Sequence, residues 1–170
     1  YGNPYPNASA QFDTPDGVVN AEGLLPNDRT HVVKISGSYR MGAGVTVGAF
    51  GTWESGTPLN EFGIDPKLGS GSPFPIFLQE RGTAGQTPSI WDLSMRLTYE
   101  PRIFAGDRWR SRLTADFLHI GSQRAAVDYE QMHYNDVDSE GNQADPNPTY
   151  GWATAYQPPM VVRLGMEILF

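Results

Sequence analysis

Residues 90–100, IWDLSMRLTYE, decide the fold, because apolar and polar side chains alternate along them without a break. One side of this stretch carries Trp91, Leu93, Met95, Leu97 and Tyr99. The other side carries Asp92, Ser94, Arg96, Thr98 and Glu100. Side chains alternate with period 2 along a β-strand, whereas a helix brings residues three or four apart onto one face. The stretch therefore predicts a strand with one apolar face and one polar face.

Four other stretches show the same alternation, at residues 31–40, 45–53, 109–120 and 160–170. Their apolar sides carry Val33, Ile35, Gly37 and Tyr39; Val45, Val47, Ala49, Gly51 and Trp53; Trp109, Leu113, Ala115 and Phe117; and Val162, Leu164, Met166, Ile168 and Phe170. The alternation weakens after Leu118. We therefore expect five strands, each with one face suited to an apolar environment.

The connections between these stretches alternate between short and long. Residues 41–44 and 101–108 are short, whereas residues 54–89 and 121–159 are long, and a further long segment, residues 1–29, precedes the first strand. Compact soluble domains rarely contain such long loops, but transmembrane β-barrels combine short periplasmic turns with long extracellular loops. We expect an all-β fold, an antiparallel transmembrane β-barrel of which residues 1–170 supply the last five strands, with the three long segments outside the cell.

Aromatic residues lie at both ends of the expected apolar faces. Counting back from the chain end places Trp53 and Trp91 at the outer boundary, and it places Tyr39, Tyr99, Trp109 and Phe170 at the inner boundary. Two aromatic girdles suit a bilayer, which has two interfaces. A soluble antiparallel sandwich would use the same apolar residues for its core, but it predicts neither two girdles nor long loops on one side.

The polar faces carry charges of both signs, which we expect to point into the lumen of the barrel. The cations are Lys34, Arg40, Arg96, Arg112 and Arg163, and the anions are Asp92, Glu100, Asp116 and Glu167. Opposite charges on neighbouring strands favour ion pairs that line a wet interior. A direct role in the passage of a substrate is the alternative.

Composition excludes several classes of function. The net charge is −7 and only two residues are lysine, which argues against a nucleic-acid partner. Cysteine is absent, so disulfides and thiol chemistry are closed off. No apolar run is long enough for a transmembrane helix, whereas a strand can span a membrane in about 9–11 residues. The chain starts at Tyr1 without an initiator Met or a signal peptide, and we expect it to be a piece of a longer protein.

No residue pattern predicts catalysis or a metal site. Nucleophile, phosphate-binding and dinucleotide motifs do not occur, and the three histidines, His31, His119 and His133, lack metal-ligand spacing. The acidic run at residues 136–142 resembles the first half of a calcium loop, but the twelfth position is Asn147 instead of a bidentate Glu. We expect a hydrated loop there, no cofactor, and a protein that is not an enzyme.

Several junction motifs together resemble the C-terminal end of TonB-dependent outer-membrane receptors, most of all the Oar-like subgroup. The motifs are residues 25–29 (LPNDR), 55–60 (SGTPLN), 81–88 (RGTAGQTP), 147–150 (NPTY), 157–159 (QPP) and 162–165 (VRLG). Residues 117–120 (FLHI) depart from the family, because many relatives show an Asn-containing stretch there. The resemblance spans most of the chain.

The resemblance implies a 22-stranded barrel with an N-terminal plug, in the outer membrane of a Gram-negative bacterium. It also implies a TonB protein of the inner membrane as the source of energy and uptake of a scarce substrate, such as a metal chelate, an oligosaccharide or a peptide. Five strands cannot close a barrel, so the remaining strands and the plug must come from upstream sequence. The alternatives are a structural or adhesive outer-membrane barrel without transport, and a soluble carbohydrate-binding β-module.

The last strand carries a further implication of the resemblance. Val162, Leu164, Met166, Ile168 and Phe170 share one face, and Phe170 is the final residue. In receptors of this kind, a terminal aromatic residue on such a strand is read by the barrel assembly machinery. We therefore expect these residues to form a C-terminal assembly signal, with outer-membrane lipid against the same face.

Overall fold

The computed structural model describes residues 15–69, 74–101 and 110–169. Their regular structure consists of antiparallel β-sheets and two short 3-10 helices, η2 (Pro15–Val18) and η3 (Gly42–Gly44). The predicted all-β, antiparallel fold is confirmed. Within these described ranges, no helix has the length and apolarity that crossing a membrane requires.

The chain folds into two compact units. We call residues 30–55, 89–125 and 156–170 the sheet unit, and residues 1–29, 56–88 and 126–155 the loop unit. The loop unit is made of the three long segments, apart from a few residues at their ends. The two units are described separately below.

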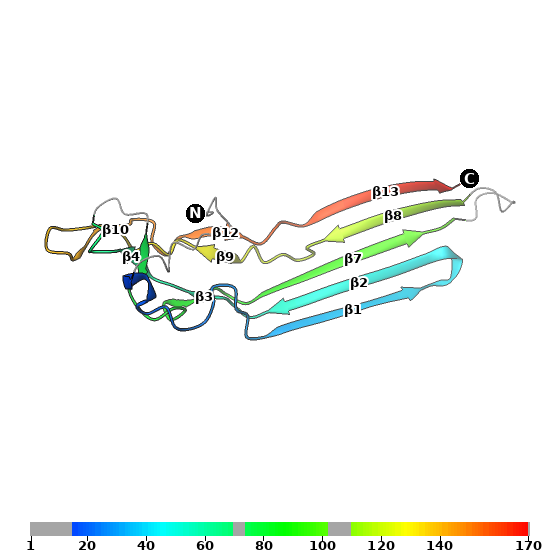
Figure 1. Cartoon of the computed structure of the whole chain (residues 1–170). Helices are drawn as coiled ribbons and strands as arrows, with labels where there is room; N and C mark the ends of the chain where they lie inside the picture. Colours follow the sequence, from blue (N-terminus) through cyan, green and yellow to red (C-terminus); the bar gives the residue numbers. More distant parts are fainter. Residues whose placement is uncertain (1–14, 70–73, 102–109, 170) are drawn as a thin grey trace. The chain divides into compact units, whose positions relative to one another are not determined.

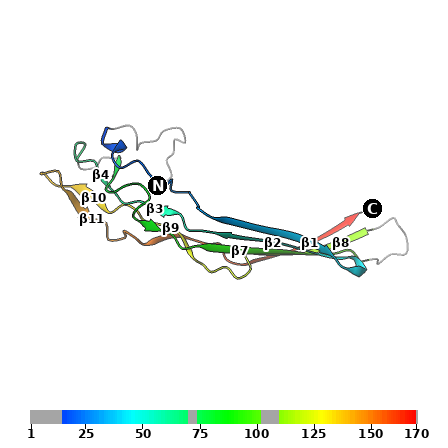
Figure 2. The same ribbon diagram turned by 90° about the horizontal axis from the view of Figure 1, so that it is seen from below.

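The sheet unit contains one five-stranded antiparallel sheet, in which neighbours follow one another along the chain (Figures 1 and 2). Its strands, in sheet order, are β1 (Val32–Arg40), β2 (Val45–Glu54), β7 (Ile90–Tyr99), β8 (Arg110–Leu118) and β13 (Val161–Leu169). Each strand lies within one or two residues of an alternating stretch of the sequence. The up-and-down order sends all three long segments away from the same end of the sheet.

The register places the apolar residues of all five strands on one face. Residues directly opposite each other on neighbouring strands share a face of the sheet. One row across the sheet is Gly37, Ala49, Met95, Phe117 and Val162. The next row on the same face is Tyr39, Val47, Leu97, Ala115 and Leu164. We call this surface the apolar face, and the opposite surface the polar face.

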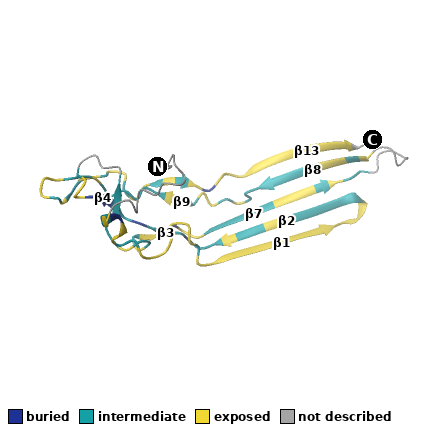
Figure 3. Cartoon of the chain, viewed as in Figure 1, coloured by how far each residue is buried: buried dark blue, intermediate teal, exposed yellow. Residues whose placement is uncertain are grey.

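Neither face of this sheet is covered within the described part of the chain. No described residue of the five strands is buried, and β1 and β13 are exposed along the lengths for which exposure is known (Figure 3). On the apolar face, Leu164 is 81% exposed and Ile35 is 71% exposed. A monomeric protein in water rarely exposes a contiguous apolar surface of this kind.

A tight turn joins β1 to β2. Met41 donates its backbone N–H to the carbonyl of Val45, and η3 fills the turn. Gly44 has a φ of +82°, and a Cβ at this position would lie 2.4 Å from the carbonyl oxygen of Glu100. The turn therefore requires glycine at position 44, both because its φ is positive and because the backbone at Glu100 approaches it closely.

The loop unit is built from pairs of short strands. They are β3 (Pro58–Leu59) with β6 (Gly85–Gln86), β4 (Phe62–Ile64) with β5 (Pro75–Phe77), β10 (Tyr134–Val137) with β11 (Gln143–Pro146), and β9 (Ala126–Tyr129) with β12 (Ala153–Tyr156). Ile64 and Phe77 are the buried apolar residues of the described chain, and the Phe62 and Phe77 rings lie 5.0 Å apart. Segments that we expected to be loops thus contain strands and a small core.

Two of the junction motifs pair with each other in the loop unit. Thr57 donates its N–H to Thr87 Oγ1 at 2.8 Å, and Thr87 donates its N–H back to the carbonyl of Thr57. Gly82 donates its N–H to Asn60 Oδ1 at 2.8 Å. The motifs at 55–60 and 81–88 are therefore two sides of one hydrogen-bonded arrangement, although the bonded residues are 22 to 30 positions apart.

Candidate functional site

The polar face of the sheet is the candidate site, because the register gathers most of the predicted charged residues there. One row across the five strands is Ser38, Gly48, Arg96, Asp116 and Arg163. A second row on this face is Lys34, Thr52 and Asp92. The alternation of each strand fixes which face a residue occupies, and the register then brings residues of distant strands together.

Arg96 and Asp116 form a two-pronged ion pair across β7 and β8. Arg96 Nε donates to Asp116 Oδ1 at 2.5 Å, and its Nη2 donates to Oδ2 at 2.9 Å. Arg163 lies directly opposite Asp116 on β13, but it forms no salt bridge with a described residue. This row therefore has an excess of one positive charge.

A second network joins four of the predicted charges at the end of the sheet near the short connections. Arg112 Nε donates to Glu100 Oε1 at 2.9 Å, and Arg112 Nη1 donates to Glu167 Oε2 at 3.1 Å. Arg40 Nη2 lies 3.6 Å from Glu100 Oε2. The four charges balance one another, and they connect β1, β8 and β13 with the residue that follows β7.

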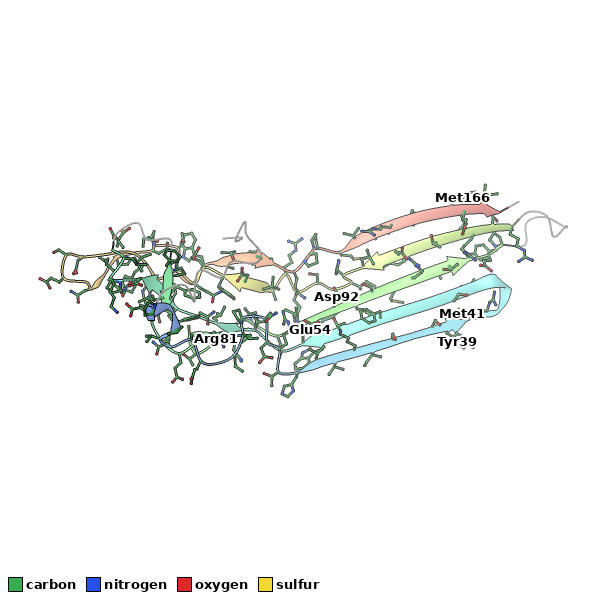
Figure 4. All side chains as sticks on the ribbon, in the orientation of Figure 1. Tyr39, Met41, Glu54, Arg81, Asp92 and Met166 are labelled. Atoms are coloured by element: carbon green, nitrogen blue, oxygen red, sulfur yellow. The ribbon has the colours of Figure 1, made fainter. Side chains whose placement is uncertain are left out.

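Asp92 lies at the opposite end of the sheet from Tyr39, Met41 and Met166 (Figure 4). Its Oδ2 is 2.5 Å from His119 Nδ1, and Ser94 Oγ is 3.4 Å from its Oδ1. The sequence indicates of His119 only that it lacks metal-ligand spacing to the other histidines. The structure gives it an acidic partner 27 positions earlier, which no local pattern could indicate.

Like Arg163, Lys34 is a predicted charge that makes no salt bridge with any described residue. The polar face also has a shallow, open surface that is lined by Gly48, Phe50, Leu118 and the Arg96–Asp116 pair among others. Phe50 is 45% exposed, although it lies on the face that is otherwise polar. The face is thus mixed, with paired charges around an apolar centre.

The predicted aromatic residues fall at the two ends of the apolar face as far as the structure describes them. Trp53 is directly opposite Trp91 on the neighbouring strand, whereas Tyr39 and Tyr99 lie near the short connections. A Cβ on Gly121 would lie 2.6 Å from the Trp91 ring, so the chain passes close over this indole. Trp109 and Phe170 lie outside the described residues.

The predicted C-terminal signal occupies β13, one edge of the sheet. Val162, Leu164, Met166 and Ile168 all point to the apolar face, and each of them is at least half exposed. Before this strand, Gln157 is buried and bridges two other segments. Its Nε2 donates to the carbonyl of Trp91 at 3.0 Å, and its Oε1 accepts from the N–H of Ala125 at 3.3 Å. This bridge gives a structural reason for the Gln in the 157–159 motif.

The acidic run at residues 136–142 contains the last two residues of β10 and the whole turn between β10 and β11. Asp138 Oδ1 accepts hydrogen bonds from the backbone N–H groups of Asn142 at 2.8 Å and Glu140 at 2.9 Å. These bonds, first of all those from Asn142, hold the pKa of Asp138 below its ordinary value. The described part of the chain contains no group of three or more His, Cys, Asp or Glu side chains that could hold a metal ion.

Part of this sequence is similar to part of a known protein. The chain is 34% identical over 89 residues to the TonB-dependent transporter Oar of Myxococcus xanthus. The match covers 50% of this chain and 8% of the transporter, so the chain spans a small part of that relative. No protein-family model and no solved structure matches the chain. At most, the similarity supports a relationship to the TonB-dependent receptors as a whole, and it does not point to any subgroup of them.

Proposed function

We propose that this chain is part of an outer-membrane TonB-dependent receptor, in which the five-stranded sheet is a stretch of the wall of a transmembrane β-barrel. The observation that carries the proposal is the continuity of the two faces: over five strands, one face is apolar and exposed, and the other carries paired charges. In a barrel wall, the apolar face would meet lipid and the polar face a wet lumen.

The dimensions of the sheet support this reading. Its strands have nine or ten residues, which is the length that spans a bilayer as a tilted β-strand. Trp91 and Tyr99 are eight residues apart on β7, about 27 Å at the usual rise per residue. At a tilt of about 35–45° the two residues would lie about 19–22 Å apart across the membrane, somewhat less than the apolar band of roughly 25 Å in outer-membrane barrels.

The charge pairing on the polar face fits a lumen-facing surface. An unpaired charge facing hydrocarbon would be costly, whereas paired charges on a solvated wall contribute little to stability and are tolerated there. Further strands pairing with β1 and β13 would remove the two open edges of the sheet, because an open edge cannot exist in the hydrocarbon region. A plug, the remaining strands and a TonB protein would then be the partners.

The function that follows is uptake of a scarce substrate, with a metal chelate, an oligosaccharide and a peptide as the candidate classes. The partial similarity to a TonB-dependent transporter supports uptake over adhesion. An adhesive barrel would have the same wall, so the sheet alone does not separate the two functions.

Binding of the TonB protein tests the proposal. The full-length protein, purified in detergent, should bind the periplasmic domain of its own bacterium's TonB protein in a calorimetric titration. The full-length protein without its N-terminal TonB-contact motif should not bind. Absence of binding by the intact protein would contradict a TonB-dependent function and favour the adhesive barrel.

A further inference from the structure

A cluster of five side chains in the loop unit joins two of the long segments. His133 Nδ1 is hydrogen-bonded to Glu61 Oε1, and Gln79 Nε2 donates to Glu61 Oε2 at 2.5 Å. The His133 ring is stacked between two phenol rings, with centroids 4.2 Å away at Tyr134 and 4.1 Å away at Tyr150. Both carboxylate oxygens and both faces of the imidazole are therefore occupied. We call these five residues the latch.

The backbone around the latch is fixed by both segments. His133 donates its N–H to the carbonyl of Phe62 at 2.8 Å, and Asn147 donates its N–H to the carbonyl of His133 at 2.8 Å. The side chain of Asn147 accepts from Thr149, and this turn carries Tyr150 onto the imidazole. Partial burial and the charge of Glu61 raise the pKa of Tyr150, so this ring stays neutral at ordinary pH.

Two further side chains that join the same two segments make hydrogen bonds of a different kind. Gln131 Oε1 accepts from the N–H of Asn60 at 2.7 Å, and the Gln143 amide pairs with both backbone groups of Ile64. These are neutral amide-to-backbone hydrogen bonds, whereas the latch combines an ionisable acceptor with ring stacking on both sides of one side chain. Hydrogen bonds to ionised groups are roughly twice as strong as neutral ones, and stacked ring pairs add to them.

The latch is also partly withdrawn from water. The side chain of Glu61 is 21% exposed and that of His133 is 30% exposed. The Arg96–Asp116 pair of the sheet includes a side chain that is 65% exposed. Because water screens exposed pairs, we expect the latch to couple its two segments more strongly than a surface pair would.

We infer that the latch locks residues 56–88 and 126–155 into one pre-ordered body, so that the second and third long segments open together and not as independent loops. The locking of the two segments does not depend on the proposed function. Its consequence does rest on the proposed function: a substrate outside the cell would meet both segments as one surface. Ordering the segments in advance lowers the entropy cost of binding.

Hydrogen exchange of the full-length protein tests the inference. In Glu61→Ala and in His133→Ala, peptides covering residues 59–66 and residues 130–147 should both exchange faster by about tenfold, a factor that coupling between contacting residues can produce. The effect of the double variant should be smaller than the sum of the two single effects, because the Glu61–His133 contact can be lost only once. Lys67→Ala is the matched control: it breaks the exposed Lys67–Asp16 pair, 2.7 Å long, and should leave residues 130–147 unchanged.

Faster exchange confined to the segment that carries the substitution would overturn the inference, as would additive effects in the double variant. Peptides from β2 and β7 report whether the sheet remains folded. If they also exchange faster, Tyr150→Ala decides, because it removes one stacked ring and keeps the Glu61–His133 pair. Faster exchange in both segments of the Tyr150→Ala variant then supports the latch, and faster exchange around residue 150 alone contradicts it. Exchange does not depend on which side of a membrane the loop unit occupies, so failure here is distinguishable from failure of the proposed function.

Discussion

At the scale of single residues, side chains next to each other on β7 lie in opposite environments. Leu97 lies in the row of Tyr39 and Leu164 on the apolar face, and Thr98 lies on the polar face between Thr46 and Thr114. Successive residues along each strand of this sheet therefore lie alternately on the apolar face and on the polar face. Substitutions at adjacent positions can test this directly.

Arginine at positions 97 and 98 should have very different effects. We expect Leu97→Arg to lower the free energy of unfolding of the full-length protein by about 1–3 kcal/mol, because a cation on the lipid face costs about 2–4 kcal/mol at mid-membrane and less toward the boundary that Tyr99 marks. Thr98→Arg should cost much less, since it adds a charge to a face that already carries ion pairs. Urea titrations in lipid vesicles measure both values, and equal costs would mean that the faces are wrongly assigned.

Gly44 should be far less tolerant of substitution than Gly42 in the same turn. Gly44→Ala forces a Cβ against the carbonyl oxygen of Glu100 at a positive φ, whereas a Cβ on Gly42 would meet nothing within 4 Å. We expect Gly44→Ala to destabilise the full-length protein by about 1–3 kcal/mol, the usual cost of such strain. Gly42→Ala should be nearly neutral in the same unfolding titration, and a comparable loss in both variants would contradict this role of Gly44.

The turn between β10 and β11 should weaken in acid. The pKa of Asp138 is depressed in the folded protein, so its contribution to stability is present above its unfolded pKa of about 3.9. That contribution is lost as the pH falls through the lower, folded value. Hydrogen exchange of the Asn142 amide, corrected for its intrinsic rate, should show protection that disappears in this acid range. In the Asp138→Asn variant, the Asn142 amide should be less protected at pH 7, and it should lose little further protection in acid. The same dependence of protection on pH in the variant and in the wild-type protein would contradict the prediction.

At the scale of elements, the sequence predicts the long strands well and the short ones not at all. Alternation continues over nine or ten residues in each strand of the sheet, which leaves no helical reading. The strands of the loop unit have two to four residues, too few to show a period, so these segments look like loops in the sequence. Gly and Pro within them, such as Pro58 and Gly85, also disguise the pairing of β3 with β6.

The candidate site, too, can be predicted from the sequence only in part. Alternation assigns each charge to a face, but pairing requires the register, which depends on contacts between strands. Arg112 and Glu167 are 55 positions apart, and His133 and Glu61 are 72 apart. Nothing local in the sequence links such residues. The sequence thus predicts which side chains share a face, and only the structure shows which of them meet.

The last strand should matter for assembly as well as for stability. We predict that the full-length Phe170→Ala variant accumulates unfolded in the periplasm, while the purified variant still folds in detergent. A merely stabilising aromatic side chain would contribute at most about 1.5–3 kcal/mol by burial, with assembly otherwise normal. Fractionation of cells, with the wild-type protein as control, measures the amount in the outer membrane. Wild-type levels and rates for this variant would rule out an assembly role.

At the scale of the whole molecule, the account predicts that the loop unit faces the outside of the cell. All three long segments leave the same end of the sheet, so they must share one side of the membrane if the sheet spans it. Protease added to intact cells should cleave within residues 54–89 or 121–159, whereas the short turn at residues 41–44 should be protected. Cleavage that requires a breached outer membrane would reverse the topology.

The claim on which the account depends is that the sheet spans a membrane with its apolar face toward lipid. The described chain offers a direct test, since it contains no cysteine and single cysteines can be placed along β7 from position 91 to position 98. In the full-length protein, freed of any other cysteine and reconstituted in lipid vesicles, each cysteine carries a nitroxide spin label. Labels at positions 93, 95 and 97 should collide with oxygen dissolved in the lipid, and labels at 94, 96 and 98 with a water-soluble nickel chelate. Accessibility to the nickel chelate at all six positions, or no alternation between odd and even positions, would contradict a membrane-spanning sheet.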